Sequence, residues 1–96
     1  MFLVLLRFSE NKNRAGEFMD RHNAWLKSGF DDGVFLLAGS LQPGLGGAII
    51  ADNTSAEELE GRVGEDPFVA EGVVSAEILD INPARADERL KFLVSE

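Results

Sequence analysis

The sequence predicts an α+β fold with the ferredoxin-like, or split βαβ, order of elements. Four short segments rich in apolar residues are typical of strands, and two segments between them have apolar residues at helical spacing. Their order along the chain is strand, helix, strand, strand, helix, strand, and in this arrangement both helices pack on one face of an antiparallel sheet. At 96 residues the chain has room for one core, so residues 1–96 are expected to form a single domain.

The first strand and helix follow from apolar patterning. Phe2–Phe8 is apolar on both faces, with Arg7 as the exception, which is typical of a central strand covered on both sides. Ser9 is a candidate N-cap for the helix that follows. Apolar residues then recur at helical spacing from Arg14 to Leu26. Gly29 and the Asp-Asp-Gly after it are expected to end this helix.

The middle of the chain predicts a hairpin and a second helix. Val34–Gly39 and Ala48–Ala51 are the expected strands, and the Gly- and Pro-rich segment 40–47 is the loop between them. Residues 54–57 (Thr to Glu) and 55–58 (Ser to Glu) each match the capping-box spacing, so a helix starts at this point.

The last third predicts a strand and a short terminal helix. The second helix should stop near Gly64, because Pro67 disfavours helical geometry in the residue before it. Val73–Ile81 is the expected fourth strand. Residues 83–94 are expected to form a short C-terminal helix, which is amphipathic through Leu90, Phe92 and Leu93.

Composition and charge exclude several classes of function. The net charge of −8, from 17 acidic and nine basic residues, disfavours nucleic acid and anionic membrane surfaces as partners. There are no cysteines, one histidine and no ion-binding loop, so neither a metal nor another cofactor is expected. The apolar start of the chain is too short for a signal peptide or a membrane span, and a cytoplasmic protein is expected.

The apolar strands also predict a partner. The strands are apolar on the face that the two helices do not cover as well, and a large exposed apolar face implies a partner surface. The residues expected there are Leu3, Leu5, Val73, Leu79 and Ile81, or those on the opposite side of the same strands. A symmetric homodimer, sheet against sheet, is the expected solution. The C-terminal helix is the alternative cover.

His22 is the one histidine and lies in the apolar stripe of the first helix. A core histidine bonded to a backbone carbonyl is one interpretation. The other is a general base, because neutral imidazole titrates near physiological pH and can take and return a proton. A base of this kind needs an acceptor, most effectively a carboxylate, at its other ring nitrogen.

Asp66 is the acceptor to test. Local rules make it a helix cap, with Pro67 at the first helical position and Gly72 just past the end of a one-turn helix. A carboxylate has two oxygens, so Asp66 can accept a bond from the backbone and one from His22. Because both helices lie on one face of the sheet, the two residues are expected to meet.

Three further residues are candidates for binding a substrate. Ser40 follows the second strand, where hydrogen bonding to a ligand and a simple turn role are both more credible than an acylating nucleophile. Arg7 can pair with an acid, extend to the sheet edge or bind an anionic substrate. Trp25 is a core residue or part of a pocket wall, whereas Phe18 and Met19 are expected in the core.

The ordered set of segments resembles the YCII-related domain family. The resemblance covers roughly residues 1–83 and is carried by "FLVLLRF", "RHNAWL", "GVFLLAGSL", the Gly-rich hairpin and "EDPFVAEGVVSAEIL". It implies a dimeric α+β barrel in which two ferredoxin-like sheets close against each other, with His22 and Asp66 in an active site near the dimer interface. Ser40 stands where the family often has proline, and the tail from Ala84 lies outside the shared region.

The resemblance also indicates a class of chemistry. The related barrel superfamily includes muconolactone isomerases, dehydrochlorinases and small monooxygenases, many of which act on ring compounds without a cofactor. We therefore expect a cofactor-independent isomerase or lyase that uses a His22–Asp66 dyad. The alternatives are a dimeric ligand-binding or accessory module with a structural His–Asp pair, and a heme- or flavin-linked oxygenase subunit, for which the sequence has no cofactor motif.

Overall fold

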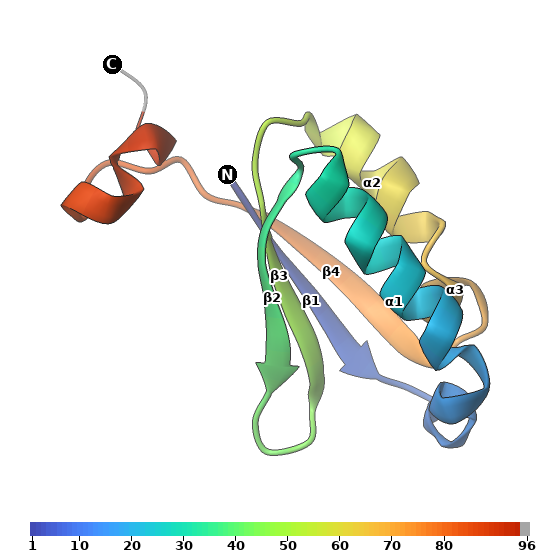
Figure 1. The fold of residues 1–96 in the computed structure, drawn as a ribbon. Helices are drawn as coiled ribbons and strands as arrows, with labels where there is room; N and C mark the ends of the chain where they lie inside the picture. Colours follow the sequence, from blue (N-terminus) through green and yellow to red (C-terminus); the bar gives the residue numbers. More distant parts are fainter. Residues whose placement is uncertain (95–96) are drawn as a thin grey trace.

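The computed structural model describes residues 1–94, which form a four-stranded antiparallel sheet with helices on one face (Figure 1). The strands are β1 (Phe2–Phe8), β2 (Phe35–Leu41), β3 (Gly46–Ala51) and β4 (Val74–Asp80). The helices are α1 (Ala15–Asp31), α2 (Ala56–Gly64), α3 (Pro67–Ala70) and the 3₁₀ helices η1 (Lys12–Arg14) and η2 (Glu88–Leu93). The predicted α+β, ferredoxin-like arrangement is confirmed. No helix in this part of the chain is long and apolar enough to cross a membrane.

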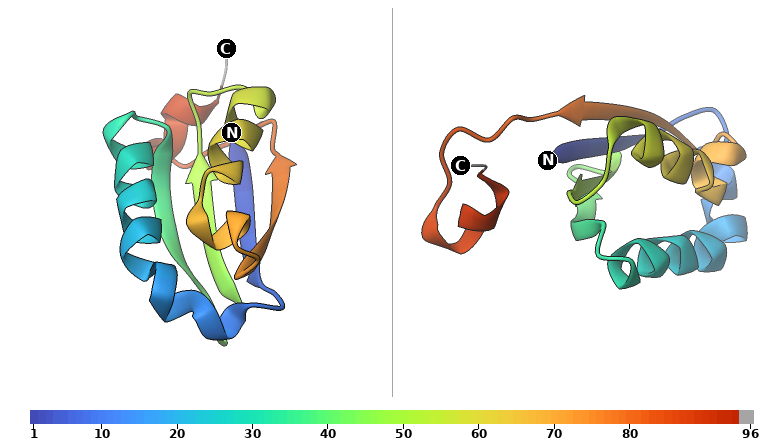
Figure 2. Two further views of the ribbon diagram at one scale, coloured as in Figure 1. Left: turned by 90° about the vertical axis from the view of Figure 1, so that its right-hand side faces the viewer. Right: turned by 90° about the horizontal axis from the view of Figure 1, so that it is seen from above.

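The sheet has the strand order β2-β3-β1-β4, so β1 and β3 are central. Val4 of β1 is aligned with Ile49 of β3 and Ile78 of β4, and this row points toward the helices. Figure 2 shows the helices together on that side of the sheet. Alternate residues therefore enter the core, and the others face the opposite side.

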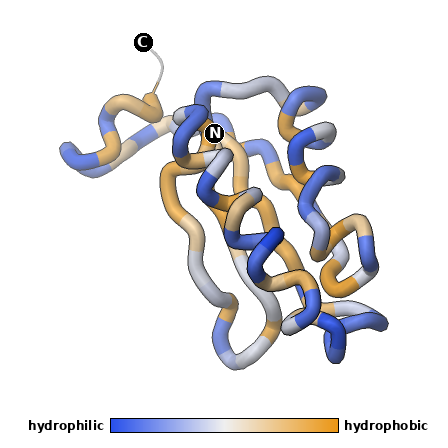
Figure 3. The backbone as a smooth tube through the Cα atoms, turned by 45° about the vertical axis from the view of Figure 1, so that its right-hand side comes forward, coloured by the Kyte–Doolittle hydropathy of each residue, from blue (hydrophilic) through white to orange (hydrophobic). Residues whose placement is uncertain are grey.

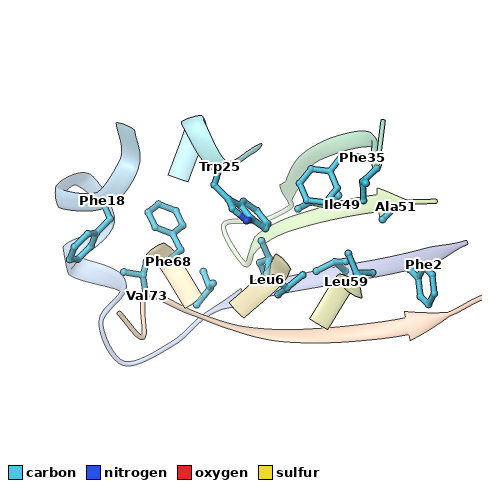
Figure 4. Close-up of a cluster of buried hydrophobic side chains, with 14 residues drawn as sticks. Phe2, Leu6, Phe18, Trp25, Phe35, Ile49, Ala51, Leu59, Phe68 and Val73 are labelled. Atoms are coloured by element: carbon cyan, nitrogen blue, oxygen red, sulfur yellow. The ribbon is translucent and has the colours of Figure 1, made fainter. Parts of the chain in front are cut away.

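The core lies between the sheet and the three α-helices (Figure 4). Val4, Ile49 and Leu59 are almost completely buried at its centre. Gly29 is also buried, and it packs so closely against β2 that a Cβ atom at this position would overlap the ring of Phe35. The close approach of α1 to β2 therefore requires a glycine here.

The Asp-Asp-Gly at 31–33 ends α1 as predicted, whereas the predictions for Gly29 and Ser9 are wrong. The helix continues through Gly29 to Asp31, and the turn comes at Gly33, whose φ of +73° suits a glycine. Ser9 does not cap α1, because η1 intervenes and the Ser9 hydroxyl instead donates to the carbonyl of Gly72 at 2.9 Å. The bond joins the end of β1 to the loop before β4.

Helix α2 begins where the capping-box spacing predicts. Ser55 is the N-cap of α2: its hydroxyl accepts from the Glu58 N–H at 3.1 Å, and the Glu58 carboxylate accepts from the Ser55 N–H. The helix ends at Gly64, as expected. Asp66 then caps α3 with Pro67 at the first helical position.

The β2–β3 hairpin is longer than the sequence indicates. Ser40 pairs with Gly47 and Leu41 with Gly46, so Ser40 is a strand residue and not a loop residue. Glycine lowers strand propensity but keeps both backbone hydrogen-bonding groups, so the ladder extends into the Gly-rich segment.

The face of the sheet opposite the helices carries an apolar row across all four strands. Leu37, Ile50, Leu3 and Leu79 are aligned in register from β2 to β4. Leu37 is 55% exposed and Leu79 is 40% exposed. Figure 3 shows the apolar residues following the strands, with hydrophilic residues recurring along the helices. We call these four residues the open-face row. The prediction of Val73 on this face is wrong: it precedes β4 and is buried in the core.

The C-terminal arm, residues 82–94, does not cover the open-face row. It extends away from the sheet and helices and ends in η2, where Leu90 is half-exposed and Phe92 is 64% exposed (Figures 1 and 2). The predicted terminal helix is therefore shorter than expected and of the 3₁₀ type. Asp87 caps it by accepting from the Arg89 N–H at 3.0 Å.

Candidate active site

His22 and Asp66 meet between α1 and α3. The Nδ1 atom of His22 lies 2.8 Å from Oδ1 of Asp66. The Asp66 side chain is fully buried, and that of His22 is 12% exposed. An ionised carboxylate can only accept hydrogen bonds, so the proton of the neutral imidazole is on Nδ1 and the lone pair is on Nε2.

The Asp-Pro-Phe segment positions both members of the pair. Oδ1 of Asp66 also accepts from the backbone N–H of Phe68 at 3.0 Å, which fixes the carboxylate at the start of α3. The Phe68 ring stacks on the His22 ring, with centroids 4.0 Å apart and an interplanar angle of 4°. Three consecutive residues thus supply the acceptor, the helix start and the surface that orients the imidazole.

The second carboxylate oxygen, Oδ2 of Asp66, is buried and has no hydrogen-bond partner among the described residues. A buried carboxylate with an open acceptor position is costly, because burial removes its hydration. The Nδ1–H of His22 is the one side-chain donor that compensates it. Loss of the imidazole would leave a buried charge without that compensation.

A cavity of about 310 Å³ lies beside the pair, between α1 and the sheet. His22 forms part of its wall, together with Asn23 and Ser40. The remaining side chains of the wall are mostly apolar and come from β1, α1, β3, α3 and β4, including Leu6, Phe8, Leu26, Ile49, Phe68 and Val74. A small apolar cavity with a few polar groups is the usual form of a ligand site.

Within residues 1–94, no three His, Cys, Asp or Glu side chains lie close enough together to hold a metal ion. The polar groups at the cavity are an imidazole, a carboxamide and a hydroxyl. The arrangement offers one group that can take up a proton, with a buried carboxylate behind it.

The family model of the YCII-related domain matches residues 1–82. The chain belongs to the YCII-related domain family. No curated protein matches it in sequence. Residues 83–94 of the C-terminal arm lie outside the match.

A solved structure similar to this YCII-related domain is 5-chloro-2-hydroxyhydroquinone dehydrochlorinase from Burkholderia phenoliruptrix, in complex with 2,5-dihydroxybenzoquinone. The TM-score is 0.68 at 16% sequence identity, and the similarity covers 84% of this chain and 93% of the other. The two proteins therefore share their fold.

Ser40 is the one predicted substrate-binding residue that the YCII-related domain places on the cavity with His22. It lies on β2 opposite Gly47, and Gly47 is in turn opposite Leu6 of β1 on the face toward the helices. Its hydroxyl has no hydrogen-bond partner among the described residues.

Arg7 and Trp25 lie elsewhere. Arg7 is on the sheet face away from the helices, where its guanidinium donates to Glu77 at 2.7 Å. Its side chain and that of His22 are separated by the sheet, because strand residues alternate between faces. Trp25 is buried behind His22 and donates from Nε1 to the carbonyl of Arg62 at 2.9 Å, so it joins α1 to α2 and does not line the cavity.

Sequence reasoning missed three cavity residues. Met19 was expected in the core, but it lines the cavity and is 41% exposed. Asn23 lies one turn after Met19 on the same face of α1. The helical spacing of the four α1 residues in the cavity wall is the signal that could have identified them: Met19, His22, Asn23 and Leu26. The stacking role of Phe68 had no signal in the sequence, because it depends on the packing of α1 against α3.

Proposed function

We propose that this YCII-related domain catalyses cofactor-independent proton transfer on a small ring or carbonyl compound, as an isomerase or lyase. The observation that carries the proposal is the 2.8 Å contact between His22 Nδ1 and Asp66 Oδ1 at the wall of the cavity. It combines a proton acceptor at Nε2 with a fixed carboxylate partner, as general-base catalysis requires.

In the proposed reaction Nε2 of His22 removes a proton from a C–H group next to a carbonyl. The bonding pair moves toward the carbonyl oxygen and forms an enolate, and His22 becomes an imidazolium with N–H groups on both nitrogens. Asp66 stabilises this cation through its carboxylate at Nδ1. Return of the proton to another carbon gives isomerisation, and departure of a leaving group from the neighbouring carbon gives elimination.

Two further findings support this reaction class. The described residues of the cavity wall include no cysteine or lysine, and the Ser40 hydroxyl makes no hydrogen bond to His22, so covalent catalysis has less support than proton transfer. The structural neighbour is a dehydrochlorinase of a chlorinated hydroxyhydroquinone. Loss of HCl from a ring is a reaction that a single base can assist.

Deuterium exchange tests the proposal without knowledge of the natural substrate. Small phenols, quinols and enolisable ketones would be incubated in D₂O with the protein, and NMR would detect deuterium entering their carbon positions. We expect exchange with the wild-type chain, its loss in His22→Gln, and its retention in Lys27→Gln. Lys27 is an exposed residue of the same helix that pairs with Asp31. Equal exchange by His22→Gln and the wild type would disprove the proposal.

The second candidate function is a ligand-binding or accessory module whose His–Asp pair is structural. It is favoured by the double use of Asp66 Oδ1, which caps α3 as well as accepting from His22. The two functions differ in the exchange experiment. A module would bind probes in the cavity and exchange none of their protons.

We further propose that the active form is a homodimer that buries the open-face row. Leu37, Ile50, Leu3 and Leu79 form a continuous apolar surface across the sheet that no described segment of the same chain covers. Burial of apolar surface contributes about 25 cal/mol per Å². A second copy presents the same row and can pair with it about a two-fold axis.

A further inference from the structure

The charges around the cavity indicate which ligands it can admit. Among the described residues that line it, His22 is the one titratable side chain, and there is no Lys, Arg, Asp or Glu. Asp66 lies behind His22, fully buried and bonded to the imidazole. A ligand carboxylate would therefore lie near a buried carboxylate that already uses the imidazole, with no Lys or Arg side chain in the cavity wall to pair with it.

Within residues 1–94 no lysine or arginine lines the cavity, although several lie near cavity residues in the sequence. Arg21, next to His22, lies over the Phe18 ring. Lys27, next to Leu26, pairs with Asp31. Lys12 lies over the ring of Phe8, which is part of the cavity wall, with its Nζ 4.9 Å from the ring centroid.

Arg7 pairs with Glu77 on the opposite face of the sheet. Arg14 pairs with Glu17 at 3.0 Å and lies over the Phe18 ring. The chain as a whole carries −8, which adds a repulsive field for anions.

The polar side chains of the cavity that can recognise a ligand are Asn23 and Ser40. Both are exposed and line the cavity, and neither the carboxamide nor the hydroxyl has a hydrogen-bond partner within residues 1–94. Each of these groups can donate and accept a hydrogen bond, which suits hydroxyl, carbonyl or amide substituents.

The volume of the cavity indicates the size of the part of a ligand that it can hold. About 310 Å³ corresponds to roughly ten water molecules at the volume that each occupies in the liquid, and so to about ten non-hydrogen atoms. A single six-membered ring with two small substituents has this size. The apolar side chains that such a ring can contact include Leu6, Leu26 and Ile49 of the cavity wall.

We propose that the cavity selects uncharged single-ring compounds and rejects carboxylates of the same shape, with Asn23 and Ser40 as the groups that bind the polar substituents. The inference rests on the proposed function in taking this cavity as the ligand site. The inference explains ligand specificity by the polar groups of Asn23 and Ser40 and by the lack of Lys or Arg among the described residues of the cavity wall. Both features are independent of whether His22 transfers a proton.

The experiment compares two probes of equal size, 4-hydroxybenzamide and 4-hydroxybenzoate, at a pH where the carboxylate is ionised. NMR titration of the ¹⁵N-labelled protein would give both dissociation constants and locate the shifted residues. We expect the amide to shift Asn23 and Ser40 and to bind at least about tenfold more tightly, because an unpaired charge is costly to bury. Asn23→Ala and Ser40→Ala should each weaken amide binding by about three- to tenfold.

Arg7→Ala is the matched control, since it removes a cation from the other face of the sheet. It should leave both dissociation constants unchanged. Any one of three results would overturn the inference. The first is that 4-hydroxybenzoate binds as tightly as 4-hydroxybenzamide. The others are that Asn23→Ala and Ser40→Ala both leave the affinity for the amide unchanged, or that the amide shifts no cavity residue.

The two proposals fail in different ways. If the amide binds in the cavity but no probe exchanges deuterium through His22, the proton-transfer function is wrong and the specificity stands. If an anionic compound is the one that exchanges, the specificity is wrong and the function stands.

Discussion

His22 and Asp66 are 44 positions apart in the sequence, and their side chains meet at 2.8 Å. The contact is possible because α1 and α3 pack on the same side of the sheet, where the Phe68 ring stacks on the imidazole. The imidazole is therefore held by the Asp66 carboxylate and by the face of the Phe68 ring, and the carboxylate is held by its bond to the start of α3. Its structural consequences can be measured separately from any activity.

Asp66→Asn is expected to release His22 from a single tautomer. The carboxylate only accepts hydrogen bonds and so keeps the proton on Nδ1, whereas a carboxamide can present either its oxygen or its NH₂ group to that nitrogen. Two-dimensional ¹H–¹⁵N NMR of the imidazole ring would show one tautomer in the wild type and a mixture in the variant. Asp32→Asn, at the exposed end of α1, is the control and should leave the ring spectrum unchanged. An Nε2–H tautomer in the wild-type protein would contradict the assignment.

Phe68→Leu is expected to weaken the positioning of His22 while keeping the cap. The backbone N–H of residue 68 still donates to Asp66, but the stacked ring is lost. We expect a loss of about 1–2 kcal/mol in the free energy of unfolding, measured in urea, and faster motion of the His22 ring by NMR relaxation. Phe30→Leu is the comparison, because Phe30 is exposed and lies at the end of α1. Ring motion equal to that of the wild type would show that Phe68 does not orient the imidazole.

Leu37→Lys and Leu79→Lys are expected to convert the proposed dimer into monomers. Both side chains are exposed in the single chain, so each substitution should leave the monomer folded but place charges in the apolar open-face row. Sedimentation equilibrium would measure the mass, and circular dichroism would check the fold. Leu45→Lys, which changes an equally exposed leucine in the β2–β3 loop, should leave the mass unchanged. A wild-type mass that equals one chain would rule out the dimer itself.

Removal of residues 83–96 is expected to leave the domain folded. Among the described residues of the arm, the ion pairs of η2 are internal to it, between Asp87 and Arg89 and between Glu88 and Lys91. The truncated chain keeps the backbone bonds between Met1 and Ile81 that close the end of the sheet. The thermal midpoint should change by less than about 5 °C, which is roughly 1 kcal/mol for a domain of this size. A non-cooperative unfolding curve would indicate that the arm packs against the domain.

Ser55→Ala is expected to destabilise α2, because it removes the hydroxyl that accepts from the Glu58 N–H. The cost should be about 1 kcal/mol in the free energy of unfolding. Thr54→Ala is the matched control one residue earlier, since the Thr54 hydroxyl bonds weakly to the Ser55 carbonyl at 3.4 Å and caps nothing. Equal effects of the two substitutions would mean that the cap at Ser55 contributes no more than its neighbour.

The sequence alone determined the order of elements and the local ends of several helices. Apolar periodicity located the four strands and two main helices, and the Ser-x-x-Glu and Asp-Pro-Phe patterns placed the caps of α2 and α3. The alternation along β1 also separated the core row from the open-face row. These features depend on neighbouring residues, whose geometry is set by backbone bonds within a turn or a strand.

The tertiary structure decided which of these residues share a site. The register of β2 on β3 makes Ser40 a strand residue in the cavity wall, where the sequence predicts a loop. The packing of α1 against α3 stacks the Phe68 ring on His22. Met19 and Asn23 line the cavity beside them, although neither was predicted there. Contacts of this kind join segments that are distant in the chain, and their geometry depends on how whole elements pack, which no local pattern specifies.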